Sequence, residues 1–189
     1  MMNNDSAFNS WDDNMAKSKK GSRPNMNPIT KSDVDEAQAK WAAAIVAIGQ
    51  AFTNGTNVKE VAEDQIAELY GYADGPVLFK PTKCKVRQFR ATPAGALSYF
   101  VGNDYAPAGF PEDQGFAIAP FISVRFHNVD IVTGAGRAIA MGNYFFETTE
   151  GATVKVEYTF GYRRGAKGIV IDVHHSSLPY DPKPDCECE

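Results

Sequence analysis

Apolar side chains between residues 32 and 70 recur every three or four positions, which is the period of an α-helix. A first helix is predicted from Ser32 to about residue 52, with one apolar face formed by Val34, Ala37, Trp41, Ile45, Ile48 and Phe52. Ser32 is the expected N-cap, because acidic residues follow it in the first turn. After the break "TNGTN", a second helix is predicted from about Val58 to Tyr70, with Gly71 as its C-terminal cap and with Val61, Ile66 and Leu69 facing inward.

From residue 75 onward the pattern changes to extended segments. "PVLFK" and "KVRQF" are predicted to be short extended pieces, 94–102 a short helix and 103–115 a loop. Four longer strands are predicted at 116–131, 136–147, 153–163 and 168–178. Short turns between consecutive strands favour antiparallel pairing, so the order of elements predicts an α+β fold with helices on one face of a sheet. Gly142 and Gly161, inside strands, are compatible with bulges that bend the sheet.

Length and charge narrow the classes of function. The chain has 189 residues, 43% of them apolar, which suits one domain with one core. We expect a disordered tail over 1–31, one domain over 32–181 and a C-terminal tail over 182–189. The 19 basic and 23 acidic residues are mixed and form no basic stripe, which argues against a nucleic acid partner. No apolar run approaches ~18 residues, so no membrane-spanning helix is expected.

The three cysteines do not suggest a disulfide framework. An odd, small number of cysteines is typical of a reducing compartment, so we expect a cytoplasmic location, with a plastid stroma as the alternative. Cys84 is expected to be a small buried side chain. Cys186 and Cys188 stand in "DCECE" and supply only half a zinc site, so a solvated chain end is the simpler interpretation.

The last strand ends in an unusual run of polar residues, "HHSS" at 174–177. Side chains alternate between the two faces of a strand, so His174 and Ser176 share one face while His175 and Ser177 share the other. The simplest interpretation is a strand that reaches water at its end. A histidine zinc site is disfavoured, because adjacent histidines point apart and the only other histidine, His127, lies in a different strand.

Several blocks of the sequence resemble the iota-class carbonic anhydrases. These blocks cover about residues 33–181 in order: "FKPTK" (79–83), "GALSYFVG" (95–102), "FPEDQGFAIAPF" (110–121), "AMGNYFF" (140–146), "KVEYTFGY" (155–162) and "HHSSLPY" (174–180). That class is related to the association domain of calcium/calmodulin-dependent protein kinase II and to the nuclear transport factor two-like superfamily. The resemblance implies an α+β fold in which a cone-shaped, curved antiparallel sheet wraps around a long N-terminal helix.

The resemblance also implies an activity and a set of site residues. The activity is the reversible hydration of carbon dioxide to bicarbonate, carried out by a homodimer. The implied catalytic residues are Thr82 of "KPTK", Tyr99 of "ALSYF", and a histidine and a serine of "HHSS". His174 with Ser176 is the preferred pair, His175 with Ser177 is the alternative, and His175 is kept as a candidate behind the site. Members of the class have been described as metal-free and as manganese-dependent; we expect no cofactor, with manganese or zinc as the alternative, because few ligands lie near the motif.

These residue types suit hydration without a metal. A histidine with an ordinary pKa near ~6.5 can relay the proton that the attacking water loses. Hydroxyl groups can polarise that water and bind the oxygens of the product. Two other hypotheses stay open: a non-catalytic oligomerisation or ligand-binding module of the same fold, and an isomerase or dehydratase that uses Asp172 with His174. Convergence of the hydroxyls of Thr82, Tyr99 and Ser176 beside one imidazole would favour the carbonic anhydrase.

Overall fold

The computed structural model describes residues 28–106, 109–166 and 168–181. Most of the two predicted tails, and with them Cys186 and Cys188, lie outside these residues. Residues 28–31, at the end of the predicted N-terminal tail, belong to the folded unit: Ile29 is buried and its amide donates to the Gly134 carbonyl. Within the described ranges no helix is both long and apolar enough to cross a membrane.

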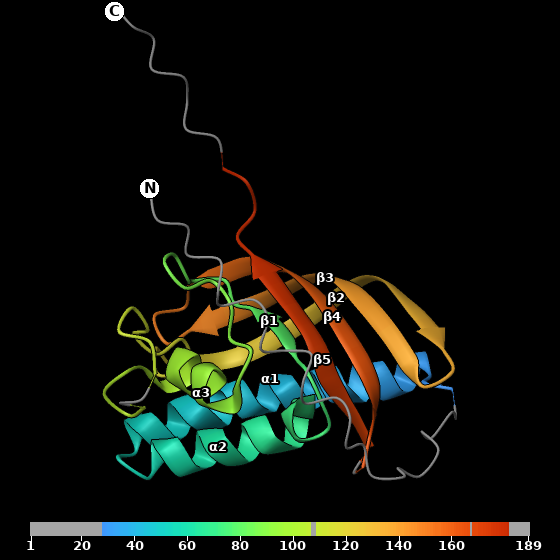
Figure 1. Ribbon diagram of the computed structural model, residues 1–189. Helices are drawn as coiled ribbons and strands as arrows, with labels where there is room; N and C mark the ends of the chain where they lie inside the picture. The colour runs from blue at the N-terminus through green and yellow to red at the C-terminus, as the bar shows by residue number, and fades with distance from the viewer. Residues whose placement is uncertain (1–27, 107–108, 167, 182–189) are drawn as a thin grey trace, which may run out of the picture.

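Helix α1, Lys31–Thr53, packs against the concave face of the sheet and contributes its apolar side chains to the core (Figure 1). Its N-cap is Thr30 and not the predicted Ser32: Thr30 Oγ1 accepts from the amide of Asp33 at 3.1 Å, and the Asp33 carboxylate accepts from the Thr30 amide at 2.8 Å. This reciprocal pair satisfies two free amides and starts the helix two residues earlier than predicted. The predicted apolar face of α1 is buried, except that Phe52 is exposed.

Two further helices complete the helical layer, with α2 packed on α1 and α3 packed on α2 (Figure 1). Helix α2, Val58–Leu69, begins at the Asn57 cap and ends at Tyr70, which is extended; Gly71, the predicted cap, instead begins the short 3-10 helix η2, Gly71–Ala73. Ile66 and Leu69 of α2 are buried as predicted, whereas Val61 is only partly buried. Helix α3, Pro93–Val101, is capped by Thr92 and matches the predicted short helix.

The sheet has five strands in the order β1-β5-β4-β3-β2. The strands are β1 Leu78–Lys80, β2 Phe121–Gly134, β3 Arg137–Thr148, β4 Thr153–Gly165 and β5 Gly168–Ser177. Strands β2 to β5 pair antiparallel as predicted, but β1 pairs parallel to β5. The predicted extended segment "KVRQF" is wrong, since residues 85–89 form bends and loop. The strand predicted from 116 begins at Phe121, because the amides of Phe116 and Ala117 instead bond to the end of α3.

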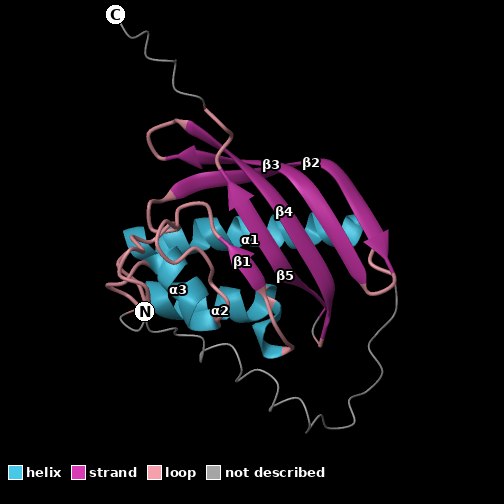
Figure 2. Ribbon diagram, turned by 45° about the horizontal axis from the view of Figure 1, so that its top comes forward, coloured by secondary structure: helices cyan, strands magenta, loops and turns pink. Residues whose placement is uncertain are grey.

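Bulges opposite two glycines bend the sheet over α1. The β2–β3 register shifts between Asn128 and Asp130, opposite Gly142, and the β4–β5 register shifts at Gly161. A Cβ on Gly142 would collide with the His127 carbonyl oxygen, so glycine permits the close approach there. Figures 1 and 2 show the resulting curved, open sheet above α1, with α2 and α3 on the same side of the sheet. The fold is therefore the predicted α+β arrangement, with the core between the concave face and the helices.

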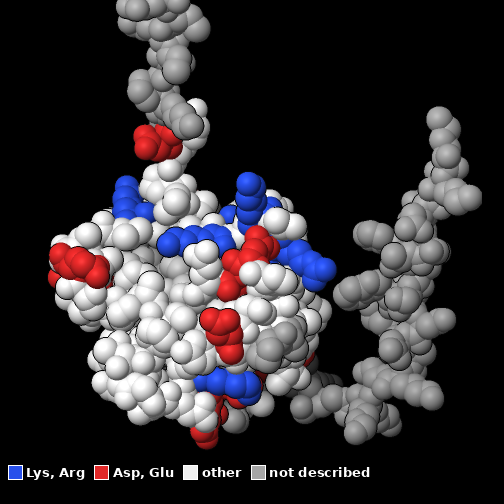
Figure 3. All heavy atoms as spheres, turned by 90° about the vertical axis from the view of Figure 1, so that its left-hand side faces the viewer, with Lys and Arg blue, Asp and Glu red and all other residues white. Residues whose placement is uncertain are grey.

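Charged side chains of both signs lie on the surface, as expected from 19 basic and 23 acidic residues (Figure 3). Figure 3 shows the end of the molecule that lies at the left of Figure 1, where α3 is located. Acidic and basic side chains are interspersed on this face, and neither sign covers a continuous area. This face lacks the single-sign basic surface that nucleic acid binding requires.

Candidate active site

Three of the predicted hydroxyl groups meet where β1 runs beside β5. The parallel register pairs Phe79 with His174 and Lys80 with His175, so the chain that continues beyond β1 carries Thr82 to the level of Ser176. Thr82 Oγ1 donates to Ser176 Oγ at 2.9 Å. Tyr99, which comes from α3, brings its hydroxyl close enough to the Thr82 hydroxyl to interact with it. Thr82, Tyr99 and Ser176, far apart in the sequence, thus form one hydroxyl cluster.

A fourth hydroxyl, that of Tyr144 on β3, belongs to the same cluster. Tyr144 is 2% exposed, and its hydroxyl lies close enough to those of Ser176 and Thr82 to interact with both. Burial raises the pKa of Tyr144 and of Tyr99 far above the usual range of a phenol. The neighbouring hydroxyls for Tyr144, and the Lys83 backbone and then Thr82 for Tyr99, oppose only part of that rise. Both phenols are therefore neutral hydrogen-bond donors at physiological pH.

The orientation of the histidine pair is resolved by the structure. His174 and Ser176 are each 2% exposed and face the interior, whereas His175 is exposed on the other face of the sheet. Ser177 donates to the carboxylate of Glu157 at 2.9 Å, away from the hydroxyl cluster. The preferred pair of the sequence analysis, His174 with Ser176, therefore lies inside, and the alternative pair, His175 with Ser177, does not.

His174 lies in an aromatic enclosure. Its ring stacks on that of Phe79, with centroids 4.4 Å apart and an interplanar angle of 16°. The centroid of the Phe160 ring lies 4.1 Å from that of His174. Tyr70 bonds His174 Nδ1 at 2.8 Å, and no partner in the described part of the chain bonds Nε2. Burial lowers the pKa of His174 well below its ordinary value, with a smaller effect from His175 in the same direction. The ring is therefore neutral at physiological pH.

The loop that carries Thr82 is fixed by the segment "FPEDQGF". The Glu112 carboxylate accepts from the backbone amides of Lys85, Val86 and Arg87, and these bonds lower its pKa to about 2. The next residue, Asp113, forms a fully buried ion pair with Arg90. The position of this segment, undecided from the sequence, is thus explained: it fastens the loop that follows Thr82.

The same segment borders a cavity of about 330 Å³. Tyr99 is the only one of the predicted site residues that lines it; the other lining residues are Lys83, Glu112, Asp113, Gln114, Gly115, Phe116, Ile118 and Ala119. Thr82, Ser176 and His174 are not among them, so of the hydroxyl cluster only Tyr99 borders this cavity. Lys83 places a cation beside this opening.

The three histidines do not converge. His174 is buried, whereas His127 and His175 are exposed on β2 and β5. No group of three or more His, Cys, Asp or Glu side chains within the described residues is placed to hold a metal ion. Asp172, the acid proposed for an isomerase, is engaged by Arg137 and by Arg163, so it is not positioned as a free partner of His174.

Sequence reasoning missed Tyr144 and Tyr70. Both look like ordinary core aromatics in the apolar pattern, and both are buried in the core. The available signal was chemical: a buried tyrosine hydroxyl needs a hydrogen-bond partner, and few polar residues point inward in this sequence.

Comparisons with known proteins agree with this geometry. The family model described as "Metal-independent carbonic anhydrase" matches residues 32–178. A metal-independent carbonic anhydrase from Nostoc sp. strain PCC 7120 is 42% identical over 157 residues, which are 81% of this chain and 75% of that protein. The crystal structure of an iota-carbonic anhydrase from a cyanobacterium, complexed with bicarbonate, aligns with a TM-score of 0.76 and 39% identity over 88% of this chain and 99% of that chain.

A more distant likeness carries no argument about function. A protein from Xanthomonas campestris, described as a calcium/calmodulin-dependent protein kinase II association domain, aligns with a TM-score of 0.43 and 21% identity, over 77% of this chain and 85% of that one. The family model and the Nostoc relative are sufficient to identify the family. This chain belongs to the metal-independent carbonic anhydrase family.

Proposed function

We propose that this protein catalyses the reversible hydration of carbon dioxide to bicarbonate and a proton, without a metal ion. The observation that carries the proposal is the convergence of the Thr82, Tyr99 and Ser176 hydroxyls, with Ser176 two positions after the buried His174 on the inward face of β5. The crystal structure with bicarbonate, 39% identical to this chain, supports bicarbonate as the ligand. The family description, metal-independent carbonic anhydrase, supports the absence of a metal cofactor, in agreement with the sequence prediction.

The chemistry requires water to attack carbon dioxide. The oxygen of water bonds to the carbon, one electron pair of a C=O bond moves onto its oxygen, and water loses one proton, which leaves bicarbonate and a proton. The Thr82 and Ser176 hydroxyls each offer a donor and acceptor positions, so they can hold the attacking water. The neutral phenols of Tyr99 and Tyr144 are fixed donors for oxygens that gain negative charge as the bond forms.

The aromatic walls complement these donors. Phe79, Phe116 and Phe146 pack around Tyr99 and Tyr144 and shield these two phenols from bulk water. Carbon dioxide is apolar and enters such a space readily, and hydrogen bonds are stronger in a site of low dielectric constant. The site therefore combines apolar aromatic surfaces with oriented hydroxyl groups.

The proposal is tested by stopped-flow hydration of carbon dioxide with protein that has been treated with a chelator. We expect full activity after chelation, and a loss of about 10²-fold or more in kcat/KM for Ser176→Ala. Ser177→Ala is the matched control, because Ser177 lies on the opposite face of the same strand and should keep activity within about twofold of wild type. Absence of activity in the wild-type protein would instead favour the non-catalytic module.

We propose that two copies of the chain associate through the outer face of the sheet. No described helix covers that face, and four large apolar side chains on β2 and β3 are 45–75% exposed there: Val129, Val132, Ile139 and Met141. Such a contiguous apolar surface on a sheet is typical of an interface between copies of a chain. His175 lies on the same face, paired across the strands with Thr159.

A further inference from the structure

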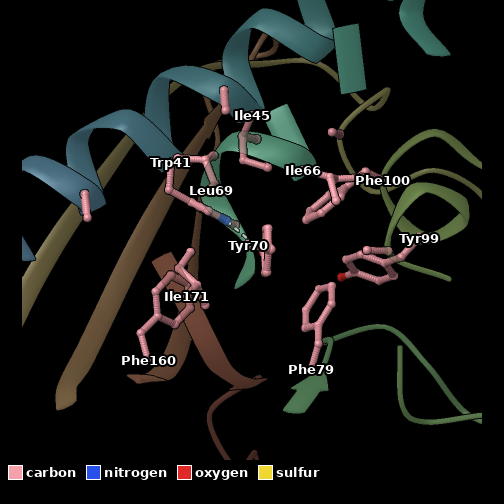
Figure 4. Close-up of a cluster of buried hydrophobic side chains, with 14 of the residues drawn as sticks. Trp41, Ile45, Ile66, Leu69, Tyr70, Phe79, Tyr99, Phe100, Phe160 and Ile171 are labelled. Carbon is pink, nitrogen blue, oxygen red and sulfur yellow. Dashed lines mark hydrogen bonds between the residues drawn. The ribbon is translucent and has the colours of Figure 1, made fainter. Parts of the chain in front are cut away.

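A chain of hydrogen bonds behind the candidate site connects α1 with the buried imidazole. Trp41 Nε1 donates to the Tyr70 hydroxyl at 3.0 Å, and this hydroxyl bonds His174 Nδ1 at 2.8 Å. The three residues come from α1, from the cap of α2 and from β5, and each is at most 3% exposed. Figure 4 shows the indole nitrogen of Trp41 directed at Tyr70 among the core aromatics.

The direction of these bonds follows from the donors available. An indole N–H only donates, so it occupies an acceptor position of the Tyr70 oxygen. The one remaining proton of the phenol needs an acceptor. Within the described residues the only acceptor bonded to the Tyr70 hydroxyl is His174 Nδ1. Tyr70 therefore donates to Nδ1, and the neutral imidazole carries its own proton on Nε2.

The Nε2 atom is the free polar position of the ring. It is buried and has no hydrogen-bond partner in the described part of the chain. Buried polar atoms are satisfied in the great majority of cases. His174 shares the inward face of β5 with Ser176, two positions along the strand, so its unpartnered Nε2 points to a ligand of the same site. The ring is held by Phe79 on one face and by Phe160, which fixes the direction of its N–H.

Among the described residues, no carboxylate contributes to the pKa of His174. The nearest acid along β5 is Asp172, whose carboxylate is neutralised by Arg137 and Arg163. The groups packed on the ring from α1, α2 and β1 are the neutral side chains Trp41, Tyr70 and Phe79. An imidazole in such surroundings gives hydrogen bonds more readily than it accepts a proton.

We propose that Trp41 and Tyr70 are positioning residues that hold His174 in the Nε2–H tautomer. In this form His174 donates a hydrogen bond to an oxygen of the bound carbon dioxide or bicarbonate. The proton of the attacking water then passes to a solvent water and not to the imidazole. The inference rests on the proposed carbonic anhydrase function for its substrate. It replaces the proton relay by histidine that the sequence analysis expects.

The tautomer is measured directly by ¹⁵N and ¹³C NMR of the histidine-labelled full chain, which contains only three histidines. We expect a protonated Nε2 and an unprotonated Nδ1 for His174, unchanged between pH 6 and 8. Tyr70→Phe removes the phenol that donates to Nδ1 and should release the ring into a mixture of tautomers. Tyr72→Phe is the matched control, since its hydroxyl bonds the Arg90 carbonyl and not the histidine.

Kinetics separate the donor role from a structural one. We expect Tyr70→Phe to lower kcat by about 10- to 100-fold, as is typical for groups that orient a histidine. His174→Gln keeps an N–H donor near the Nε2 position, so it should retain about tenfold more activity than His174→Ala. A proton relay would be lost equally in both variants.

Two results would overturn the inference. One is an Nδ1–H tautomer, or titration of His174 near its ordinary pKa, in the wild-type protein. The other is a Tyr70→Phe variant whose tautomer and kcat both match wild type. A wild-type protein without any hydration activity would overturn the proposed function instead, and the NMR measurement would still decide the tautomer.

Discussion

At the scale of single residues, the buried imidazole of His174 is expected to lower the stability of the fold in acid. Folding transfers His174 from water into a ring of aromatic side chains and depresses its pKa. The unfolded chain keeps the ordinary pKa near ~6.5. Between the folded and the unfolded pKa values the unfolded state therefore binds one more proton than the folded state, and the free energy of unfolding decreases as pH falls.

This linkage predicts a defined pH dependence. As pH falls from about 6.5 toward 5.5, the free energy of unfolding should decrease by up to about 1.4 kcal/mol per pH unit. His174→Gln should flatten this slope, whereas His175→Gln, on the exposed face, should leave it unchanged. Urea unfolding at several pH values measures both slopes. Carboxylates with a lowered pKa, such as Glu112, change the free energy of unfolding only at pH values below their ordinary pKa. A His174→Gln slope equal to that of wild type between about pH 6.5 and 5.5 would therefore contradict the assignment of this effect to His174.

At the scale of elements, a buried ion pair joins three segments around the site. The Arg90 guanidinium, from the loop after β1, is bonded to the carboxylate of Asp113 from the loop after α3. The same carboxylate accepts from the Ser98 hydroxyl of α3 at 2.7 Å, and the guanidinium lies 4.0 Å from the centroid of the Phe110 ring. Because Arg90 and Asp113 have no exposed side-chain area, removal of either would leave an unpaired buried charge.

We therefore expect Asp113→Ala to destabilise the protein by about 3–5 kcal/mol. It should also lower carbon dioxide hydration, because the loop that carries Thr82 loses its attachment. Asp130→Ala is the comparison variant: its ion pair with Lys31 is exposed, at 72% for the aspartate, so the melting temperature should hardly change. Thermal unfolding followed by circular dichroism gives both values. Equal melting temperatures for the two variants would show that the buried pair does not hold this region.

At the scale of the whole molecule, one face of the sheet is covered by helices and the other presents apolar side chains to solvent. The concave face contains the hydroxyl cluster, and the outer face carries Ile139 and Met141 at 45% and 55% exposure. The proposed site and the proposed dimer interface therefore lie on opposite faces of one sheet. A change on the outer face should alter the oligomeric state without direct contact with the Thr82–Ser176 pair.

This separation predicts that Ile139→Lys with Met141→Lys converts the proposed dimer into a monomer, since buried unpaired lysines oppose association. Val86→Lys is the control, because Val86 is 80% exposed in the loop after β1 and lies away from the outer face. Light scattering after size exclusion measures the mass of each variant. A wild-type protein that is monomeric at all concentrations would refute the dimer. The cytoplasmic or plastid location stays a prediction from cysteine content.

The positions of most helices and strands, and the family, could be predicted from the sequence alone. The 3.6-residue period placed α1, α2 and α3, the alternating runs placed β2 to β5, and the blocks around Thr82, Tyr99 and "HHSS" indicated the family. The strand period also grouped His174 with Ser176. These features depend on local spacing and on short segments, which a sequence displays directly.

Only the tertiary structure decided which histidine faces the interior. Both faces of β5 carry apolar residues, so the pattern did not distinguish them; the bulge at Gly161 leaves Asp172 without a cross-strand partner and places Ile171 on the same side as His174. The parallel pairing of β1, the Tyr144 hydroxyl and the bond from Tyr70 to His174 were likewise absent from the sequence prediction. Each depends on contacts between residues far apart in the chain, and a close approach of this kind leaves no periodic signal in the sequence.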